Sequence, residues 1–442
     1  MIETTLQFLE TVRDDAWTYI GFPVILGLGL FLSFRSRFLQ FRKFPFILSA
    51  FYKMLTISES DHKGVHPLGA LFTSLGGCVG IGNVVAICGA VQIGGPGALF
   101  WVWIAAGLGM ILKYAEVYLG MKFRITNQEG AYEGGPMYYL QRVFKTMWIP
   151  NILAFLLCLY GVEIYQFNII TSSVSTNFHV NYVLATFIIL GLVIYTASGG
   201  IQRVANVSST IIPVFIVLYL SMGLWVLVHN LGVIPGVIAT VFQSAFTGHA
   251  ALGGFVGSTM MMAISQGIAQ GCYSTDVGIG YASIIHSESR VQVPQKQACL
   301  TIFEIFLDSF VICTMSILLI LVTGVWKEPI HESVLVQTAL AEYFPMMHFF
   351  MPIFLLLLGY STIISFFFVG IKCAEYLSPK NGRQIFYIAA TLSLFLFSFI
   401  ESRQTLIVMS FVGVLLLFIN LYGIYRLRDE LAYNLDFDSI HE

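Results

Sequence analysis

Four glycines and an asparagine are clustered in the segment Leu75–Asn83, inside an apolar stretch from about residue 67 to 93. Glycine destabilises a helix by about 1 kcal/mol relative to alanine, so the cluster predicts a membrane helix that unwinds halfway across. Unwound backbone at this depth is tolerated only where it is buried in protein or lines a cavity, and its free N–H and C=O groups can then bind a substrate or an ion. The alternative is that the glycines only allow two helices to approach closely.

A second stretch, 265–280, is also punctuated by glycines and polar residues, and we expect its helix to break over Gln266–Ser274. Two broken spans in corresponding halves of a chain indicate a transporter binding site. Half-helix N-termini would supply N–H donors for the carboxylate of a zwitterion, and half-helix C-terminal ends would supply carbonyls for its ammonium. The residues predicted to bind a substrate at the two breaks are Gly77, Gly80, Gly82, Asn83, Gln266, Gly267, Gly271 and Cys272.

Polar side chains also stand in the middle of apolar spans. Asn83 can contact a ligand or cap the second half-helix, and the two roles are compatible. Gln166 either bonds between helices or binds a ligand. Glu163 lies about one turn earlier, and an ionisable group at this depth indicates a functional site, although its role stays open. For Ser361 and Thr362, the residues alone favour hydroxyls that bond back to carbonyls four residues earlier.

Two charged residues of one span, Lys113 and Glu116, are three positions apart. They can therefore form an ion pair on one helix face, and we expect that pair to be structural or part of an inner gate. The other ionisable residues expected within spans are Glu163, Asp276, Glu304 and Asp308.

The composition is that of a membrane protein with many spans. Of the 442 residues, 57% are hydrophobic and 10% charged, against about 25% charged in soluble domains. The net charge of −2 offers no basic surface for a nucleic acid. Neither the seven cysteines nor the nine histidines show the spacing of a metal site or of a disulfide framework. Because no nucleophile, base or metal set converges, we expect no enzyme.

Hydropathy predicts an all-α integral membrane protein with eleven transmembrane helices of about 20 residues each. With the N-terminus outside and the C-terminus inside, 18 of the 22 Lys and Arg residues fall on inside loops and three on outside loops, as the positive-inside rule requires. Between spans, Glu133–Phe144 is expected to form an interfacial helix, and Gly232–Gly254 an external segment with its own short helix. The spans lie at about 18–34, 67–93, 97–121, 150–175, 181–197, 205–229, 252–285 (broken), 295–323, 346–370, 384–400 and 404–425.

The ten spans after the first form two sets of five with opposite orientation, and each set begins with a broken span. This arrangement predicts a five-plus-five inverted repeat of the leucine-transporter type, found in the APC superfamily. The predicted organisation is an N-terminal span with a basic cytoplasmic loop (1–66), a first repeat (67–229), an external connector (230–251), a second repeat (252–428) and a cytoplasmic tail (429–442).

A series of motifs runs in order through about residues 20–425. They are Gly80-Ile-Gly-Asn83, Gly94-Gly-Pro-Gly-Ala-Leu-Phe-Trp-Val-Trp103, Gly109-Met-Ile-Leu-Lys-Tyr-Ala-Glu116, Gly134-Gly-Pro-Met-Tyr-Tyr139, Gly199-Gly-Ile-Gln-Arg203, Asp308 with Cys313-Thr314, Tyr360-Ser-Thr-Ile-Ile364 and Glu375-Tyr-Leu377. Taken together, they resemble the signature of the alanine or glycine:cation symporter family. The resemblance implies the same inverted-repeat fold and a secondary transporter that takes up a small neutral amino acid with a cation.

The resemblance also implies roles for single residues. It favours a substrate role for Gln166, and it places Phe366 where the family has a tryptophan that closes the substrate pocket. By the same resemblance, hydroxyls of adjacent serine and threonine residues face carbonyls of the first broken helix and hold sodium, a cation that hard oxygen ligands suit. The implied sodium ligands are Ser361 and Thr362 with the carbonyls of Gly76, Val79 and Leu358.

Four positions differ from the family pattern: Asp276 stands for a glutamate, Gln270 for an arginine, Phe366 for a tryptophan and Ile371 for a glutamate. These differences leave the exact amino acid open, and also the choice between sodium and proton as the coupling ion. The residues expected to act in coupling or gating are Lys113, Glu116, Glu163, Asp276 and Asp308. We expect a monomer in the lipid bilayer of a bacterial cytoplasmic membrane, with sodium and an amino acid as its partners.

Overall fold

The computed structural model describes residues 2–55, 64–127, 130–247, 260–400 and 402–435, and these form a bundle of α-helices with one small antiparallel sheet. The sheet pairs β1 (Ile125–Thr126) with β2 (Tyr132–Glu133). The predicted start of the second broken span (252–259), the end of the predicted connector (248–251) and the end of the predicted tail (436–442) lie outside the described residues.

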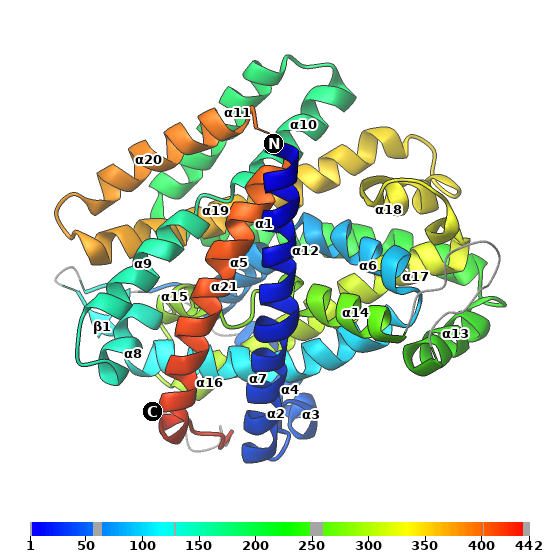
Figure 1. Ribbon diagram of the computed structural model, residues 1–442. Helices are drawn as coiled ribbons and strands as arrows, with labels where there is room; N and C mark the ends of the chain where they lie inside the picture. The colour runs from blue at the N-terminus through cyan, green and yellow to red at the C-terminus, as the bar shows by residue number, and fades with distance from the viewer. Residues whose placement is uncertain (1, 56–63, 128–129, 248–259, 401, 436–442) are drawn as a thin grey trace.

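The first helical rod is longer than the predicted span 18–34. It consists of α1 (Ile2–Ala16), the π-helical turn η1 (Trp17–Gly21) and α2 (Phe22–Arg35), without a break between them. The helix α21 (Ser402–Arg426) runs beside α1 (Figure 1). The predicted span was too short because α1 is polar. Hydropathy therefore did not detect that α1 continues the apolar helix α2 towards the N-terminus.

By length and composition, seven helical rods among the described residues could each cross a membrane, and α5 with the short α6 forms an eighth that is bent by 65°. The predicted spans 181–197 and 384–400 correspond to the shorter apolar helices α11 (Tyr182–Ser198) and α20 (Gly382–Phe397). The predicted count of eleven therefore stays a prediction. The helices of the rods not yet given are α5 (Pro67–Cys78), α6 (Ala86–Gly94), α7 (Ala98–Lys122), α9 (Trp148–Tyr160), α10 (Ile164–Phe178), α12 (Gly200–His229), α16 (Pro294–Ile305), α17 (Thr314–Thr323) and α19 (Met347–Leu377).

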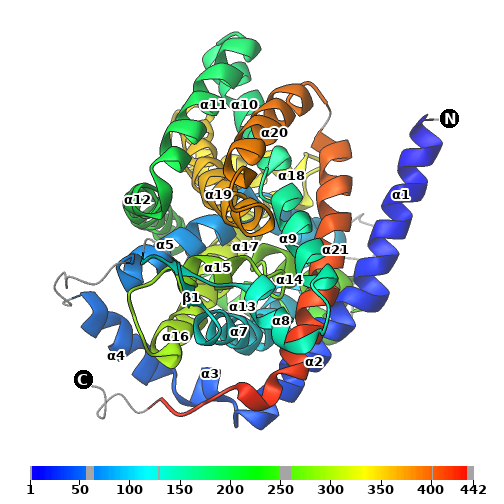
Figure 2. The same cartoon turned by 90° about the vertical axis from the view of Figure 1, so that its left-hand side faces the viewer.

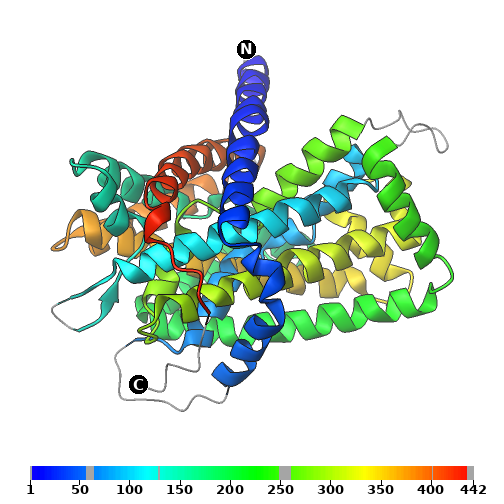
Figure 3. The same cartoon turned by 90° about the horizontal axis from the view of Figure 1, so that it is seen from below.

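Two of these helices form the centre of the bundle. Nearly all of α7 is buried, because α2, α14 (Met260–Ser274), α15 (Tyr281–Ser287) and α16 pack around it. The helix α19, which extends beyond the predicted end at residue 370, is buried against α5, α9, α10 and α12. Seen from below, α7, α12 and the α16–α17 rod run in similar directions across the molecule (Figure 3).

Shorter helices complete the fold. The helix α8 lies within the predicted interfacial segment 133–144, and α13 lies within the predicted external segment 232–254. In Figure 2, α10, α11 and α20 gather at one end of the molecule, and α2, α3 and α4 at the other. The remaining elements are α3 (Leu39–Arg42), α4 (Phe44–Leu55), η2 (Ile81–Asn83), α8 (Pro136–Val143), α13 (Ile234–Thr247), η3 (Phe306–Cys313), η4 (Val325–Lys327), α18 (Glu332–Ala341) and η5 (Arg428–Glu430).

Candidate substrate and ion site

The first predicted break is confirmed. The helix α5 ends at Cys78, a single 3₁₀ turn follows at η2, and α6 begins at Ala86. Gly77, in the last turn of α5, lies against the side chain of Tyr281, and a Cβ at this position would lie only 1.9 Å from the Tyr281 hydroxyl oxygen. A glycine is therefore required for α15 to approach the end of α5.

Asn83 holds the unwound turn in shape. Its Oδ1 accepts a hydrogen bond of 3.0 Å from the Gly80 N–H, and its Nδ2 donates to Asp308 Oδ1 over 2.6 Å. The predicted capping of the second half-helix by Asn83 is wrong, since α6 begins after Val85 without a side-chain cap; Asn83 instead closes the 3₁₀ turn, and its amide is anchored to η3. Asp308, which was expected to act in coupling or gating, reaches the break through this contact. The π-helical geometry of η3 is common at functional sites.

The second break is displaced from its predicted position at Gln266–Ser274. The helix α14 continues without interruption to Ser274, and the chain unwinds over 275–280 before α15 begins. Gly267 and Gly271 instead let α14 pack on α7, because a Cβ at Gly267 would lie 2.4 Å from the Ala98 carbonyl oxygen. The break falls where glycines take left-handed backbone, with φ of +84° at Gly278 and +96° at Gly280.

A third interruption was not predicted. The span expected at 150–175 is divided at 161–163 between α9 and α10. At this point Glu163 adopts φ of +51°, and Asp276 in the second break adopts φ of +49°. Left-handed backbone is uncommon for residues other than glycine, and such strain is concentrated at functional sites. Two acidic residues are therefore held in this conformation at two separate interruptions.

The three interruptions surround one central cavity, with about 30 Å³ of free space between its walls. A space of this size holds about two water molecules and is well below the roughly 300–1,000 Å³ of ligand pockets, so the walls must move apart before an amino acid can enter. Of the predicted site residues, the cavity brings together Gly77, Gly80, Gly82, Asn83, Glu163, Gln166, Asp276, Thr362 and Phe366. The walls also include Cys78, Tyr160, Tyr273 and Ser274, which were not predicted.

Four predicted substrate residues lie outside this cavity: Gln266, Gly267, Gly271 and Cys272. The displaced break explains the discrepancy, since residues inside a continuous helix keep their backbone groups hydrogen-bonded and have none free for a ligand. The signal shared by Tyr160 and Tyr273 is that each is a polar aromatic residue that closely precedes an interruption. The sequence alone does not give the positions of these interruptions, so it could not identify the two tyrosines as site residues.

Polar atoms around the cavity retain unused hydrogen-bonding capacity. Gln166 Oε1 and Ser274 Oγ are buried and have no hydrogen-bond partner among the described residues. Such groups are costly unless a ligand or water satisfies them. On an adjacent wall, the Phe366 ring stacks on Tyr281 with a centroid distance of 4.0 Å and meets Tyr160 edge-on at 5.4 Å. The cavity thus combines unsatisfied polar atoms with an apolar aromatic surface.

The residues expected to hold sodium lie where α19 crosses the end of α5. Thr362 Oγ1 is 3.1 Å from both the Gly76 and the Leu358 carbonyl oxygens. The bond to Leu358 is the one that the residues alone favoured, and the contact with Gly76 adds the first broken helix. Ser361 Oγ is buried without a partner and would lie 2.2 Å from a Cβ at Gly76. Val79 follows the end of α5. The hydroxyls of Ser361 and Thr362 and the carbonyls of Gly76 and Leu358 therefore lie together near the first break.

The expected pair between Lys113 and Glu116 does not form. Lys113 Nζ instead makes a salt bridge of 2.9 Å with Glu304 Oε1, and both side chains are fully buried. Glu116 accepts hydrogen bonds from the N–H groups of Gly280 and Ser283, at the start of α15. The two side chains therefore point to different elements, although they belong to one helix.

The Lys113 ammonium joins the two breaks of the inverted repeat. It donates to the Thr275 carbonyl oxygen over 3.1 Å and lies 2.7 Å from Cys78 Sγ. Both groups stand at the C-terminal end of a half-helix, where the helix dipole favours a positive charge. On the other side, Glu304 accepts a hydrogen bond from Ser74 and lies 3.3 Å from His286 Nε2. Lys113 is therefore a fixed cation between the breaks, and Glu304 compensates its charge.

The chain was compared with known proteins. Residues 2–437 match the model of the sodium:alanine symporter family. The chain is 31% identical to the sodium/alanine symporter AgcS of Methanococcus maripaludis over 88% of this chain and 87% of that one. It is 29% identical to the amino-acid carrier protein AlsT of Bacillus subtilis over 97% of this chain and 90% of that one.

Among solved structures, the fold is similar to that of MhsT in complex with L-phenylalanine. The TM-score is 0.60 at 13% sequence identity, over 83% of this chain and 90% of that one. Together with the two broken helices, this likeness supports the inverted-repeat transporter fold. Because the family model covers nearly the whole chain, the protein belongs to the sodium:alanine symporter family, whose members are transporters and not enzymes.

Proposed function

We propose that the protein is a secondary active transporter that takes up a small neutral amino acid, such as alanine or glycine, together with sodium by alternating access. The observation that carries the proposal is the convergence of interrupted helices on a small cavity in which Gln166 Oε1 and Ser274 Oγ have no hydrogen-bond partner within the described ranges. Membership of the family agrees with it, as does the similarity to the relative from Methanococcus maripaludis, which is named a sodium/alanine symporter.

The two ends of an amino acid match different parts of the cavity. The substrate carboxylate would accept hydrogen bonds from the N–H groups of Ile81 and Gly82 in the unwound turn, at the positive end of α6, because the Gly80 N–H is bonded to Asn83 Oδ1. The ammonium would lie near the carbonyl ends of α5 and α14 and the carboxylate of Glu163. The apolar ring of Phe366 would then contact a short side chain.

The test of this proposal is uptake by purified protein in proteoliposomes. We expect labelled alanine or glycine to accumulate under an inward sodium gradient, and the accumulation to disappear when the gradient is collapsed. Empty liposomes provide the background. If no small neutral amino acid is accumulated under a sodium or a proton gradient, the proposed function is wrong.

Sodium binding at Ser361 and Thr362 gives a separate prediction. In the double variant Ser361→Ala/Thr362→Ala, we expect the sodium concentration for half-maximal uptake to rise about ten-fold or more, equivalent to about 1.4 kcal/mol, because two oxygen ligands are removed. Substrate binding at saturating sodium should change less. The matched control is Thr323→Ala, since Thr323 also bonds to a carbonyl four residues earlier but lies on α17. An unchanged sodium dependence in the double variant would contradict this ion site.

The second candidate is proton-coupled uptake of a different small amino acid or solute. Two carboxylates at the cavity, Glu163 and Asp276, favour it, because carboxylates inside a membrane protein commonly serve as proton relays. A panel of labelled amino acids, measured at several pH values with and without sodium, distinguishes the two. Uptake driven by a pH gradient in the absence of sodium would establish the second candidate.

For the location, we propose the cytoplasmic membrane of a bacterium, with the N-terminus outside, the C-terminus inside and a single chain as the transport unit. The asymmetry of basic residues between alternate loops supports this orientation. Labelling of single cysteines introduced near each end of the chain, with a reagent that does not cross the membrane, tests it. Labelling of the C-terminal cysteine in intact cells would reverse the orientation.

A further inference from the structure

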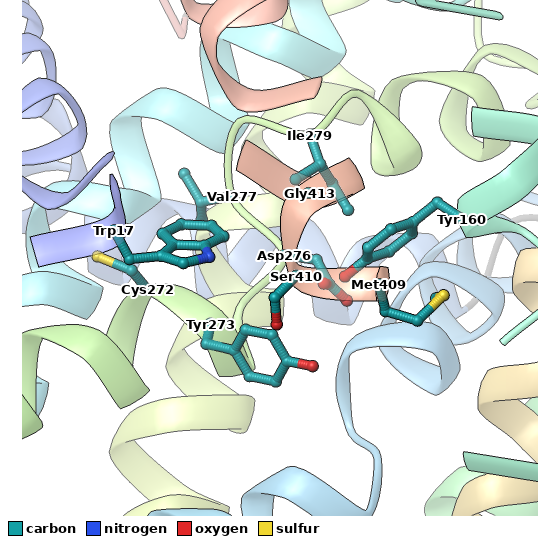
Figure 4. A pocket seen from close by; sticks show the side chains of 10 residues that line it. All are labelled: Trp17, Tyr160, Cys272, Tyr273, Asp276, Val277, Ile279, Met409, Ser410 and Gly413. Carbon is teal, nitrogen blue, oxygen red and sulfur yellow. The ribbon is translucent and has the colours of Figure 1, made fainter. Parts of the chain in front are cut away.

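A second, smaller cavity lies beside the central one. The two share the walls formed by Tyr160, Tyr273 and Asp276. The rest of the second cavity comes from α14, the second break, α21 and the N-terminal rod (Figure 4), with Trp17, Cys272, Val277, Ile279, Met409, Ser410 and Gly413 as its lining. The N-terminal rod stands outside the predicted inverted repeat, yet it contributes a wall close to the substrate site.

Most polar side-chain groups of this cavity carry oxygen; the others are the Trp17 N–H and the Cys272 thiol. Asp276 supplies a carboxylate, and the Tyr160 hydroxyl lies beside it (Figure 4). The hydroxyls of Tyr273 and Ser410 line the same space (Figure 4). Hard cations prefer carboxylate and hydroxyl oxygens. The chemistry of the lining therefore suits an alkali cation, and the remaining walls are apolar.

Asp276 makes no direct ion pair within the described part of the chain, although the charge of Lys113 acts on it from a distance. Among the described residues, no Lys, Arg or His side chain forms an ion pair with its carboxylate, whereas Glu304 has Lys113 close by. A charged carboxylate away from bulk water is costly unless a cation or a proton accompanies it. The strained backbone of Asp276, with φ of +49°, holds this side chain at the wall between the two cavities.

The size of the cavity distinguishes among the possible occupants. Its free space holds about one water-sized particle, so it is too small for an amino acid. A proton on Asp276 would need only one acceptor and no surrounding hollow. A sodium ion needs both the space and several oxygens, and both are present.

The N-terminal rod covers this space. Trp17 lies in the π-helical turn η1, and its ring packs over Gly413 of α21, where a Cβ would lie 3.5 Å from both the Trp17 and the Tyr160 rings. The indole thus closes the cavity on the side away from the substrate. This role gives the N-terminal rod a function beyond anchoring the chain.

We propose that this second cavity binds a sodium ion, held by the Asp276 carboxylate and the hydroxyls of Tyr160, Tyr273 and Ser410 and covered by Trp17. This ion is distinct from the one at Ser361 and Thr362. The inference rests on the proposed sodium-coupled transport and adds that two sodium ions accompany each substrate molecule. Because Asp276 also lines the central cavity, the second ion would stabilise the wall that the substrate contacts, and ion and substrate would raise each other's affinity.

Two measurements test the proposal. In proteoliposomes without a membrane potential, the logarithm of the accumulation ratio of alanine is plotted against the logarithm of the sodium ratio. At equilibrium, the accumulation ratio of the substrate equals the sodium ratio raised to the number of coupled sodium ions. We therefore expect a slope of about two for the wild type and about one for Asp276→Asn. A slope of about one in the wild type, or of about two in Asp276→Asn, would overturn the proposal. A wild-type slope of one for sodium and one for the proton ratio would place a proton on Asp276 instead.

The second measurement does not depend on transport. Equilibrium binding of radiolabelled sodium to purified protein should give about two ions per chain for the wild type and about one for Asp276→Asn. If two ions bind but no amino acid is accumulated, the proposed function fails and the second site stands. If one ion binds and transport is sodium-driven, the second site fails and the function stands.

If Asp276→Asn does not fold, variants that keep the Asp276 carboxylate still test the proposal. We expect Ser410→Ala and Tyr160→Phe each to weaken the second binding event about ten-fold and to leave the first unchanged. Ser244→Ala is the matched control, since Ser244 is buried in α13 and bonds within its own helix. Wild-type binding of both ions in the two test variants would overturn the assignment of the ligands.

Discussion

Replacing Lys113 by methionine is expected to destabilise the protein by about 3–5 kcal/mol, because it leaves the buried Glu304 carboxylate without its cation. The salt bridge between them is 2.9 Å long, and neither side chain is exposed. The same ammonium also binds the Thr275 carbonyl and Cys78 at the two breaks. Thermal unfolding of the purified variant in detergent, together with the yield of folded protein from membranes, measures the effect.

The same helix offers a matched control. Lys122 also forms a salt bridge of 2.8 Å, with Glu430, but 32% of its side chain and 49% of its partner's are exposed. Exposed pairs contribute about 1 kcal/mol or less, so Lys122→Met should be nearly as stable as the wild type. If Lys113→Met is as stable as Lys122→Met, the buried salt bridge does not have the role assigned to it.

A double variant separates stability from transport. Lys113→Met/Glu304→Met removes both charges and replaces them with side chains of similar length, which is often neutral for stability. We expect it to recover most of the loss in unfolding temperature and to remain inactive in uptake, because no cation then joins the two breaks. Full uptake by the double variant would show that Lys113 acts on stability alone.

Substituting alanine for Gly77 is expected to abolish uptake and to destabilise the protein by about 1–3 kcal/mol, the usual range for overpacking. The added Cβ would lie 1.9 Å from the Tyr281 hydroxyl oxygen. That hydroxyl cannot easily move, since it donates a hydrogen bond of 3.1 Å to the Thr73 carbonyl. The half-helices α5 and α15 would have to separate, and the cavity between them would change shape. Unfolding temperature and alanine uptake measure the two effects.

Gly82 is the matched control for stability, because a Cβ at that position meets no atom within 4 Å. Both glycines belong to the same motif, so a general effect of alanine on the unwound turn would appear in both variants. We expect Gly82→Ala to unfold at nearly the wild-type temperature. Equal destabilisation of the two variants would contradict the steric explanation.

Local patterns explain what could be predicted from the sequence. The break at Gly76–Asn83 was predictable because four glycines within seven positions weaken any helix, whatever surrounds it. The break in the second repeat was placed too early because Gly267 and Gly271 are also consistent with helix packing, and only the neighbouring α7 distinguishes the two roles. The interruption at Glu163 carries no glycine cluster, and its one glycine, Gly161, lies so close to α19 that a Cβ would be 2.8 Å from the Phe366 carbonyl oxygen.

The sequence by itself determined the membrane class, the approximate spans, the first break and the family, because each depends on composition or on residues close together in the chain. Only the tertiary structure decided that Lys113 pairs with Glu304 and not with Glu116, and that Tyr160, Tyr273 and Asp276 separate two cavities. These arrangements join residues from distant helices. The partner of a buried charge is fixed by which helices pack together, and the spacing within one helix does not encode that packing.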